Sequence, residues 1–220
     1  MLIVVFEQSV TQATYINSIY YVGSSFWTLV LGVMLRYYGR IKTYTLVLGI
    51  PFFIVGQGML IAFSPSFTPI VLMVVSKILI SFGGGSIFPI EQMVLMSVSQ
   101  EHTLALLAVE SVIIDIGKGA GSAIGTAIWT LVFKTKLMQY LPSTESANLD
   151  KIYGSLTVQS SYASGSEARL AINHAYLDTQ RIIFIVASSL LAISWISVCF
   201  WKDVDVGKNV RKGRNTSFLK

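Results

Sequence analysis

Charged side chains within long apolar stretches are the residues of this sequence whose types and spacing best suit chemistry. Glu110, Asp115 and Lys118 lie in the otherwise apolar run AVESVIIDIGKGAGSAIGTAIW. An ionisable group costs about 3 kcal/mol at the centre of a bilayer, so all three are candidates for a substrate or proton pathway. Asp115 and Lys118 are three residues apart and can pair on a helix. We expect Glu110 to carry a proton. For Asp115 and Lys118, the alternative to a substrate or proton site is a neutral structural pair that is buried against a neighbouring helix.

A second apolar stretch combines charges with helix-breaking residues. Lys77 and Glu91 flank the sequence Ser81-Phe-Gly-Gly-Gly-Ser86, and Pro89 follows it. We add Lys77 and Glu91 to the candidate substrate or proton pathway. They are 14 residues apart, about 21 Å along a regular helix, so they cannot pair within it. Three glycines before a proline predict a loosened or broken helix, which transporters use for substrate sites; a packing notch with a proline kink is the alternative.

Glycines also recur at every fourth position in the stretch that carries Glu110. Small residues at this spacing let two helix backbones approach closely in lipid. We therefore assign both glycine clusters to helix packing. These glycines are Gly83, Gly84, Gly85, Gly117, Gly121 and Gly125.

Tyrosines mark the long polar segment before the last apolar stretch. Together they could form a docking face for a ligand, whereas anchoring at the membrane interface or packing within the loop is the alternative. These tyrosines are Tyr140, Tyr153, Tyr162 and Tyr176.

The composition favours a membrane protein that is not an enzyme. Hydrophobic residues make up 53% of the 220 residues and charged residues only 12%, against about 25% charged in soluble domains. The basic residues are too segregated for a nucleic-acid partner. The sequence shows no His/Cys metal cluster, phosphate-binding loop or nucleophile elbow, so we expect no metal, no cofactor and no hydrolytic or ATP-driven chemistry. The expected environment is a lipid bilayer.

Five apolar stretches predict an all-α polytopic membrane protein with about five transmembrane helices. The helices are expected at 17–36, 43–63, 69–96, 104–133 and 182–201. This divides the chain into an external N-terminal segment (1–16), a four-helix transmembrane region (17–134), an external loop (135–181), a last transmembrane helix (182–201) and a basic cytoplasmic tail (202–220). The orientation follows from the Lys and Arg residues of the first loop and the tail, which favour the cytoplasmic side.

The first loop resembles a motif of the major facilitator superfamily. Its sequence, GVMLRYYGRIK, is similar to the cytoplasmic G-x-x-x-D-x-x-G-R-[RK] loop, with an arginine where the acidic residue usually stands. The matching residues are Gly32, Arg36, Gly39, Arg40 and Lys42.

Across essentially the whole length, the chain resembles the C-terminal part of the fungal siderophore–iron transporters of this superfamily. The resemblance rests on the three consecutive glycines, on Pro89, on the Glu101-His102 turn and on the run GKGAGSAIGTAIW. It implies proton-coupled movement of ferric siderophores across a plasma, endosomal or vacuolar membrane. A related branch exchanges glutathione for protons, and the charges of the glycine-rich stretch keep that alternative open.

The family has more helices than this chain, and alternating access needs two halves around a central site. The resemblance therefore implies a transporter fragment whose N-terminal helices are missing. The alternative is a truncated, non-transporting membrane protein that packs with a partner through its glycines.

Overall fold

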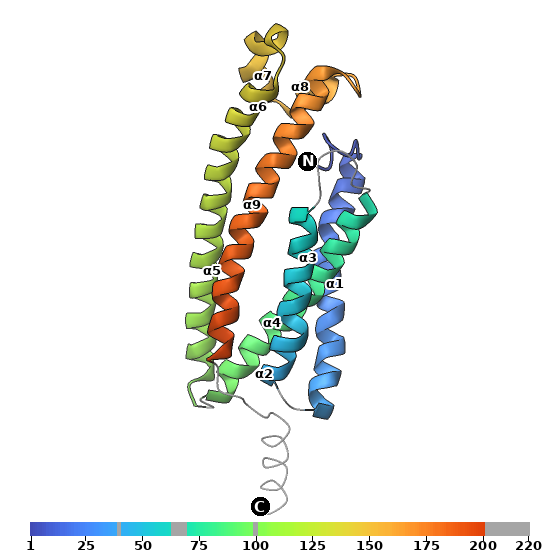
Figure 1. The fold of residues 1–220 in the computed structure, drawn as a ribbon. Helices are drawn as coiled ribbons and strands as arrows, with labels where there is room; N and C mark the ends of the chain where they lie inside the picture. The colour runs from blue at the N-terminus through green and yellow to red at the C-terminus, as the bar shows by residue number, and fades with distance from the viewer. Residues whose placement is uncertain (39–40, 63–69, 99–100, 201–220) are drawn as a thin grey trace, which may run out of the picture.

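The chain folds into a bundle of helices with a smaller helical region at one end (Figure 1). A computed structural model describes residues 1–38, 41–62, 70–98 and 101–200, and all regular structure within them is helical. Five helices form the body: α1 (Val10–Tyr38), α3 (Ile50–Ala62), α4 (Ile70–Val98), α5 (Thr103–Ile128) and α9 (Glu167–Cys199). Helices satisfy every backbone polar group internally, as a bilayer requires. The prediction of an all-α membrane fold is confirmed.

Within the described residues, four helices are long and apolar enough to cross a membrane. They cover Val10–Tyr37, Lys42–Ala62, Ile70–Ser97 and Glu167–Cys199. The second begins in α2 (Ile41–Tyr44) and runs through the π-helical turn η1 (Thr45–Gly49) into α3. Helix α5 is not among the four, and it carries Glu110, Asp115 and Lys118 in its apolar sequence. That α5 also crosses the bilayer stays a prediction.

Helix α4 packs along both α1 and α3, and glycines bring the backbones together. A Cβ atom placed on Gly83 of α4 would lie 2.8 Å from the carbonyl oxygen of Gly49 and 2.8 Å from the amide nitrogen of Phe53. A Cβ on Gly56 of α3 would lie 2.8 Å from the carbonyl oxygen of Ser76. These contacts are closer than any side chain permits, so the α3–α4 interface depends on glycine.

Helix α4 runs unbroken through the glycines and Pro89, so the predicted break is wrong. Proline has no N–H, and it therefore leaves the carbonyl of Gly85, four residues earlier, without its helical partner. Thr28 Oγ1 of α1 donates to that carbonyl oxygen at 2.9 Å. Beside it, Trp27 Nε1 donates to Ser86 Oγ at 2.7 Å. Hydroxyl groups of neighbouring helices commonly replace a bond lost to proline in membrane proteins.

The segment expected as an external loop is folded. After the π-helical turn η2 (Trp129–Phe133), it contains α6 (Lys134–Tyr140), the 3₁₀ helix η3 (Ser143–Asn148), α7 (Leu149–Gly154) and α8 (Leu156–Ser161). We call residues 134–176 the cap. Its core combines residues from four parts of the chain: Val4, Phe133, Leu137, Ile152, Ile172, Ala175 and Tyr176. Figure 1 shows the cap at the end of the bundle opposite α2.

Helix α9 begins at Glu167, well before the predicted start at Ile182. Its first turns carry polar residues, but they pack Ile172 and Ala175 into the cap core. Ser166 caps the helix, since its hydroxyl accepts from the backbone N–H of Arg169 at 3.2 Å. Likewise α1 begins at Val10 rather than at residue 17. The predicted basic tail, 202–220, lies outside the described residues.

Candidate functional site

A partly open cavity of about 450 Å³ lies where the bundle meets the cap. Helices α1, α3, α4 and α9 line it, together with Leu156 of α8 and the first three residues of the chain. Its volume falls within the range of about 300–1,000 Å³ that is typical of small-molecule sites. Most of the lining is apolar, and its polar side chains are Asn17, Tyr20, Gln57, Lys77 and Gln180.

Lys77 supplies the positive charge of this cavity. Its Nζ donates to Asn17 Oδ1 of α1 at 3.1 Å. The other lining side chains are neutral, and Gln57 and Gln180 face the cavity from α3 and α9. A cation surrounded by neutral amides within a membrane bundle suits an oxygen-rich or anionic ligand.

A second, smaller pocket adjoins the first. It shares Leu60, Met73, Gln180 and Phe184 with the larger cavity, and it adds Arg181 to the lining. The two pockets therefore lie side by side, with one basic side chain in the lining of each.

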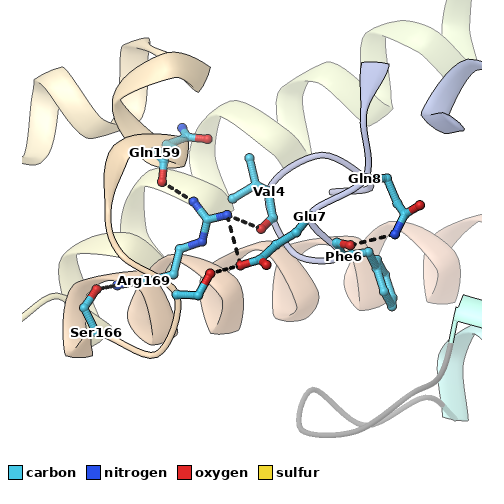
Figure 2. A network of polar contacts seen from close by, with 8 residues as sticks. Val4, Phe6, Glu7, Gln8, Gln159, Ser166 and Arg169 are labelled. Atoms are coloured by element: carbon cyan, nitrogen blue, oxygen red, sulfur yellow. Dashed lines mark hydrogen bonds and ion pairs between the residues drawn. The ribbon is translucent and has the colours of Figure 1, made fainter. Parts of the chain in front are cut away.

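The N-terminal segment that closes one side of the cavity is held by Arg169. Figure 2 shows the guanidinium between Val4, Glu7 and Gln159. Arg169 Nη2 donates to the Val4 carbonyl at 2.7 Å and lies 3.9 Å from Glu7 Oε1, and Nη1 donates to the carbonyl of Gln159. Arg169 is buried whereas Glu7 is largely exposed. The buried arginine thus fixes the start of the chain to the cap.

Glu91 and Glu110 lie on the neighbouring helices α4 and α5, which are in contact with each other. Glu110 is only 7% exposed, and its Oε1 has no hydrogen-bond partner among the described residues. Glu91 is half-buried. The structure therefore brings together two of the five residues predicted for a substrate or proton pathway, at a distance from the Lys77 cavity.

Asp115 and Lys118 pair with each other, as their spacing predicts. Lys118 Nζ lies 3.1 Å from Asp115 Oδ1, and both side chains are more than 70% exposed. The expectation that this pair is buried against a neighbouring helix is therefore not met within the described chain. The glycines of the same helix have open space where a Cβ would stand, namely Gly117, Gly121 and Gly125. In contrast, Gly84 lies against the Tyr20 ring and Gly85 against the backbone of Ser24.

The predicted docking tyrosines are bound within the cap. Tyr176 is buried, and its hydroxyl donates to Gln159 Oε1 at 2.6 Å, so it cannot contribute to a docking surface. The ring of Tyr153 packs on the cap core. Tyr162 and Tyr140 donate their hydroxyls to the carboxylates of Glu145 and Asp178, at 2.9 and 2.6 Å.

Two ion pairs stabilise the outer surface of the cap. Lys134 pairs with Asp150 at 2.9 Å, and Lys136 pairs with Asp178 at 3.3 Å. The hydrogen bond to Asp178 raises the pKa of Lys136 above its ordinary value. These contacts join α6 to α7 and to α9.

The first-loop motif lies at the opposite end of the bundle. Lys42 Nζ donates to the carbonyl of Cys199, the last residue of α9, at 2.8 Å. A cation at the C-terminus of a helix also complements the helix dipole. Gly32 and Arg36 are exposed. Gly39 and Arg40 lie outside the described residues.

Helices of membrane-spanning length and apolar composition place the chain among integral membrane proteins. The chain is 40% identical over 204 residues to the MFS siderochrome iron transporter 1 of Ajellomyces capsulatus, covering 92% of this chain and 35% of the relative. It is 34% identical to siderochrome iron transporter 2 of Aspergillus fumigatus (96% and 35%) and to a siderophore iron transporter of Emericella nidulans (98% and 35%).

Over most of its length this chain is therefore related to the fungal siderochrome iron transporters of the major facilitator superfamily, and the resemblance predicted from the sequence is confirmed. The chain spans about 35% of the length of these curated relatives. No family model matches it, and no solved structure matches it.

Sequence reasoning identified Lys77 but missed the neutral side chains around it. Asn17, Gln57 and Gln180 each lie in or beside an apolar stretch. A polar amide among apolar residues is a signal in the sequence that could have identified them as cavity residues. Arg169 lies in the segment that was expected to be an external loop. Its burial depends on the folded cap, which no local pattern indicates.

Proposed function

We propose that this chain is the C-terminal part of a proton-coupled transporter that moves ferric siderophores across a fungal plasma, endosomal or vacuolar membrane. The observation that carries the substrate class is the 40% identity to a relative named for siderochrome iron. The cavity around Lys77 supports the proposal, because it offers polar groups from four helices in a space of small-molecule size. In the proposed orientation the cap is external and the Lys42 end is cytoplasmic.

The uncovered face of α5 supports the proposal that further helices belong to the working protein. Asp115, Lys118 and the glycines of this helix have no neighbouring element against them in the described chain. Intramembrane charges in transporters face the interior of a bundle or a water-filled cavity. Helices from the remaining part of a longer protein would cover this face and supply the second half that alternating access needs.

Glu110 is the proposed proton carrier, with Glu91 as its neighbour. Carboxyl groups on adjacent helices are the kind of residue that forms proton relays in transporters. Glu110 is buried and has an unpartnered oxygen, which suits a group that exchanges a proton with its surroundings.

A chimera tests this function. The chain would replace the matching segment of the Ajellomyces capsulatus relative in a yeast strain without siderophore uptake, and accumulation of radioactive iron chelate would be measured at two external pH values. We expect uptake that increases at acidic pH. Glu110→Gln should remove the pH dependence, and Glu101→Gln, an exposed carboxylate at a turn, is the matched control.

Two results would contradict separate parts of the proposal. A well-expressed chimera that accumulates no chelate would contradict siderophore transport. A Glu110→Gln chimera whose uptake keeps its full pH dependence would contradict the role of Glu110 alone.

A further inference from the structure

We infer that the Lys77 cavity selects ferric chelates that carry a negative charge outside their iron-binding groups, and that Lys77 and Arg181 bind this charge. The inference rests on the proposed function and deepens it, because it names the property by which one chelate is preferred over another. The ligand feature is chemical: a carboxylate or similar anion attached to the periphery of the chelate.

The charges of the lining residues favour an anion. Among the described residues, the two adjoining pockets are lined by two basic side chains, Lys77 and Arg181, and by no acidic one. The pockets share lining residues that include Gln180, so the two cations border adjacent spaces. A space of this kind has a positive potential, which attracts anions and disfavours cations.

Neither cation forms an ion pair with a carboxylate in the part of the chain that the structure describes. The ion pairs of the described residues involve Lys118, Lys134, Lys136 and Arg169, but not Lys77 or Arg181. Charged groups at membrane depth are costly unless they are paired or line a polar cavity. A bound anion would supply the missing counter-charge, so the unbalanced charge itself points to the ligand.

Lys77 also retains donors for a ligand oxygen. An ammonium group has three N–H donors, and Asn17 Oδ1 accepts one of them at 3.1 Å. This bond orients the ammonium while its other donors point elsewhere. The amides of Gln57 and Gln180 complete a set of neutral donors and acceptors for the rest of the chelate.

The test uses three chelates that share one iron-binding core. They are a linear ferric trihydroxamate with a terminal amine, its N-acetyl derivative and its N-succinyl derivative, so the end of the molecule is cationic, neutral or anionic. Binding of each, loaded with radioactive iron, would be measured by equilibrium dialysis against the purified chain in lipid nanodiscs. We expect the succinyl form to bind about tenfold more tightly than the amine, with the acetyl form between them.

Variants assign the preference to the cavity. Lys77→Met should remove most of the difference between the chelates, and Lys77→Arg should restore it. Lys151→Met is the matched control, because it removes the same charge from an exposed position in α7. Circular dichroism and size-exclusion profiles would establish that each variant is folded.

The outcomes separate this inference from the proposed function. If all three chelates bind wild-type protein equally, or if Lys77→Met keeps the order of affinities, the inference is wrong while siderophore binding stands. If none of the three binds the folded wild-type chain, the inference is wrong, because the cavity is lined by residues of this chain alone. The proposed function is decided separately, by iron uptake in the chimera.

Discussion

Thr28 Oγ1 lies 2.9 Å from the carbonyl oxygen of Gly85, the backbone group that Pro89 deprives of its helical hydrogen bond. The two residues are on different helices, α1 and α4, and 57 positions apart. The same hydroxyl lies 2.9 Å from the carbonyl of Ser24 in its own helix. One threonine therefore joins α1 to α4 at the position where α4 is weakest.

Replacing this threonine should destabilise the bundle. Thr28→Val keeps the shape of the side chain but leaves the Gly85 carbonyl without a partner, at an expected loss of about 1 kcal/mol in the free energy of unfolding. Thr28→Ser should retain most of the stability. Unfolding by increasing SDS in mixed micelles would measure these changes.

Pro89→Ala provides the matching test, because alanine returns an N–H to the Gly85 carbonyl. In that background Thr28→Val should cost much less than it does in the wild type. An equal loss in both backgrounds would show that Thr28 acts by some contact other than the one with Gly85.

The effect of a glycine-to-alanine substitution on stability should depend on whether the glycine packs against a neighbouring helix or faces open space. Gly83→Ala would place a methyl group 2.8 Å from the Gly49 carbonyl oxygen, and overpacking of this kind costs about 1–3 kcal/mol. Gly117→Ala meets open space in the described chain and gains helix propensity, so the stability of the isolated chain should not fall. Equal destabilisation by both substitutions in the SDS assay would contradict the packing described for α4.

Arg169 should control the order of the N-terminal segment. Arg169→Gln removes its charged hydrogen bonds to the carbonyls of Val4 and Gln159, each worth about 1.5–3 kcal/mol. We expect residues 1–8 to lose protection from hydrogen exchange and to become sensitive to protease, while the helices of the bundle stay protected. Arg36→Gln, an exposed arginine in the last turn of α1, is the control. Unchanged protection of the segment in Arg169→Gln would contradict the role of the arginine.

Glu145 should make the outer surface of the cap sensitive to acid. Hydrogen bonds from Asn148 Nδ2 and Tyr162 Oη, both at 2.9 Å, lower the pKa of Glu145 below its ordinary value of 4.5. A carboxyl group whose pKa is lowered by folding stabilises the fold fully above its unfolded pKa, and this contribution disappears as the pH falls through the folded pKa. Hydrogen exchange of residues 143–162, corrected for the intrinsic rate, should therefore increase selectively in acid.

Glu145→Gln removes the titrating group and should flatten this pH dependence. Glu167→Gln, an exposed carboxylate in the first turn of α9, should leave it unchanged. A wild-type cap whose exchange is the same above and below the pKa of Glu145 would contradict the prediction.

Much of the fold could be predicted, because a membrane helix is visible in the sequence as a continuous run of apolar residues. Apolar runs located α1, α3, α4 and most of α9 without any tertiary information. The continuity of α4 could not be predicted in this way, since the group that repairs it, Thr28, is on another helix. The cap was missed for a similar reason, because its core joins Val4 to Ile152 and Ile172 across distant parts of the chain.

In the candidate site too, some residues could be predicted from the local sequence, whereas others depend on how the helices pack. A lysine in an apolar stretch is conspicuous, and Lys77 was identified for that reason. The approach of Glu91 to Glu110 depends on how α4 and α5 pack, which the spacing within each helix does not determine. The exposure of Asp115 and Lys118 likewise follows from the absence of a neighbouring element on that face among the described residues.

The bond from Lys42 Nζ to the Cys199 carbonyl ties the segment after α1 to the far end of α9. Helix α9 also lines the cavity through Gln180 and Phe184, so this one helix connects the Lys42 hydrogen bond with the cavity. A motion that separates the Lys42 segment from α9 has to break this hydrogen bond, whereas a motion that keeps the bond carries α9 along. A displacement of α9 at Gln180 and Phe184 would in this way reach Lys42, at the end of the bundle opposite the cap.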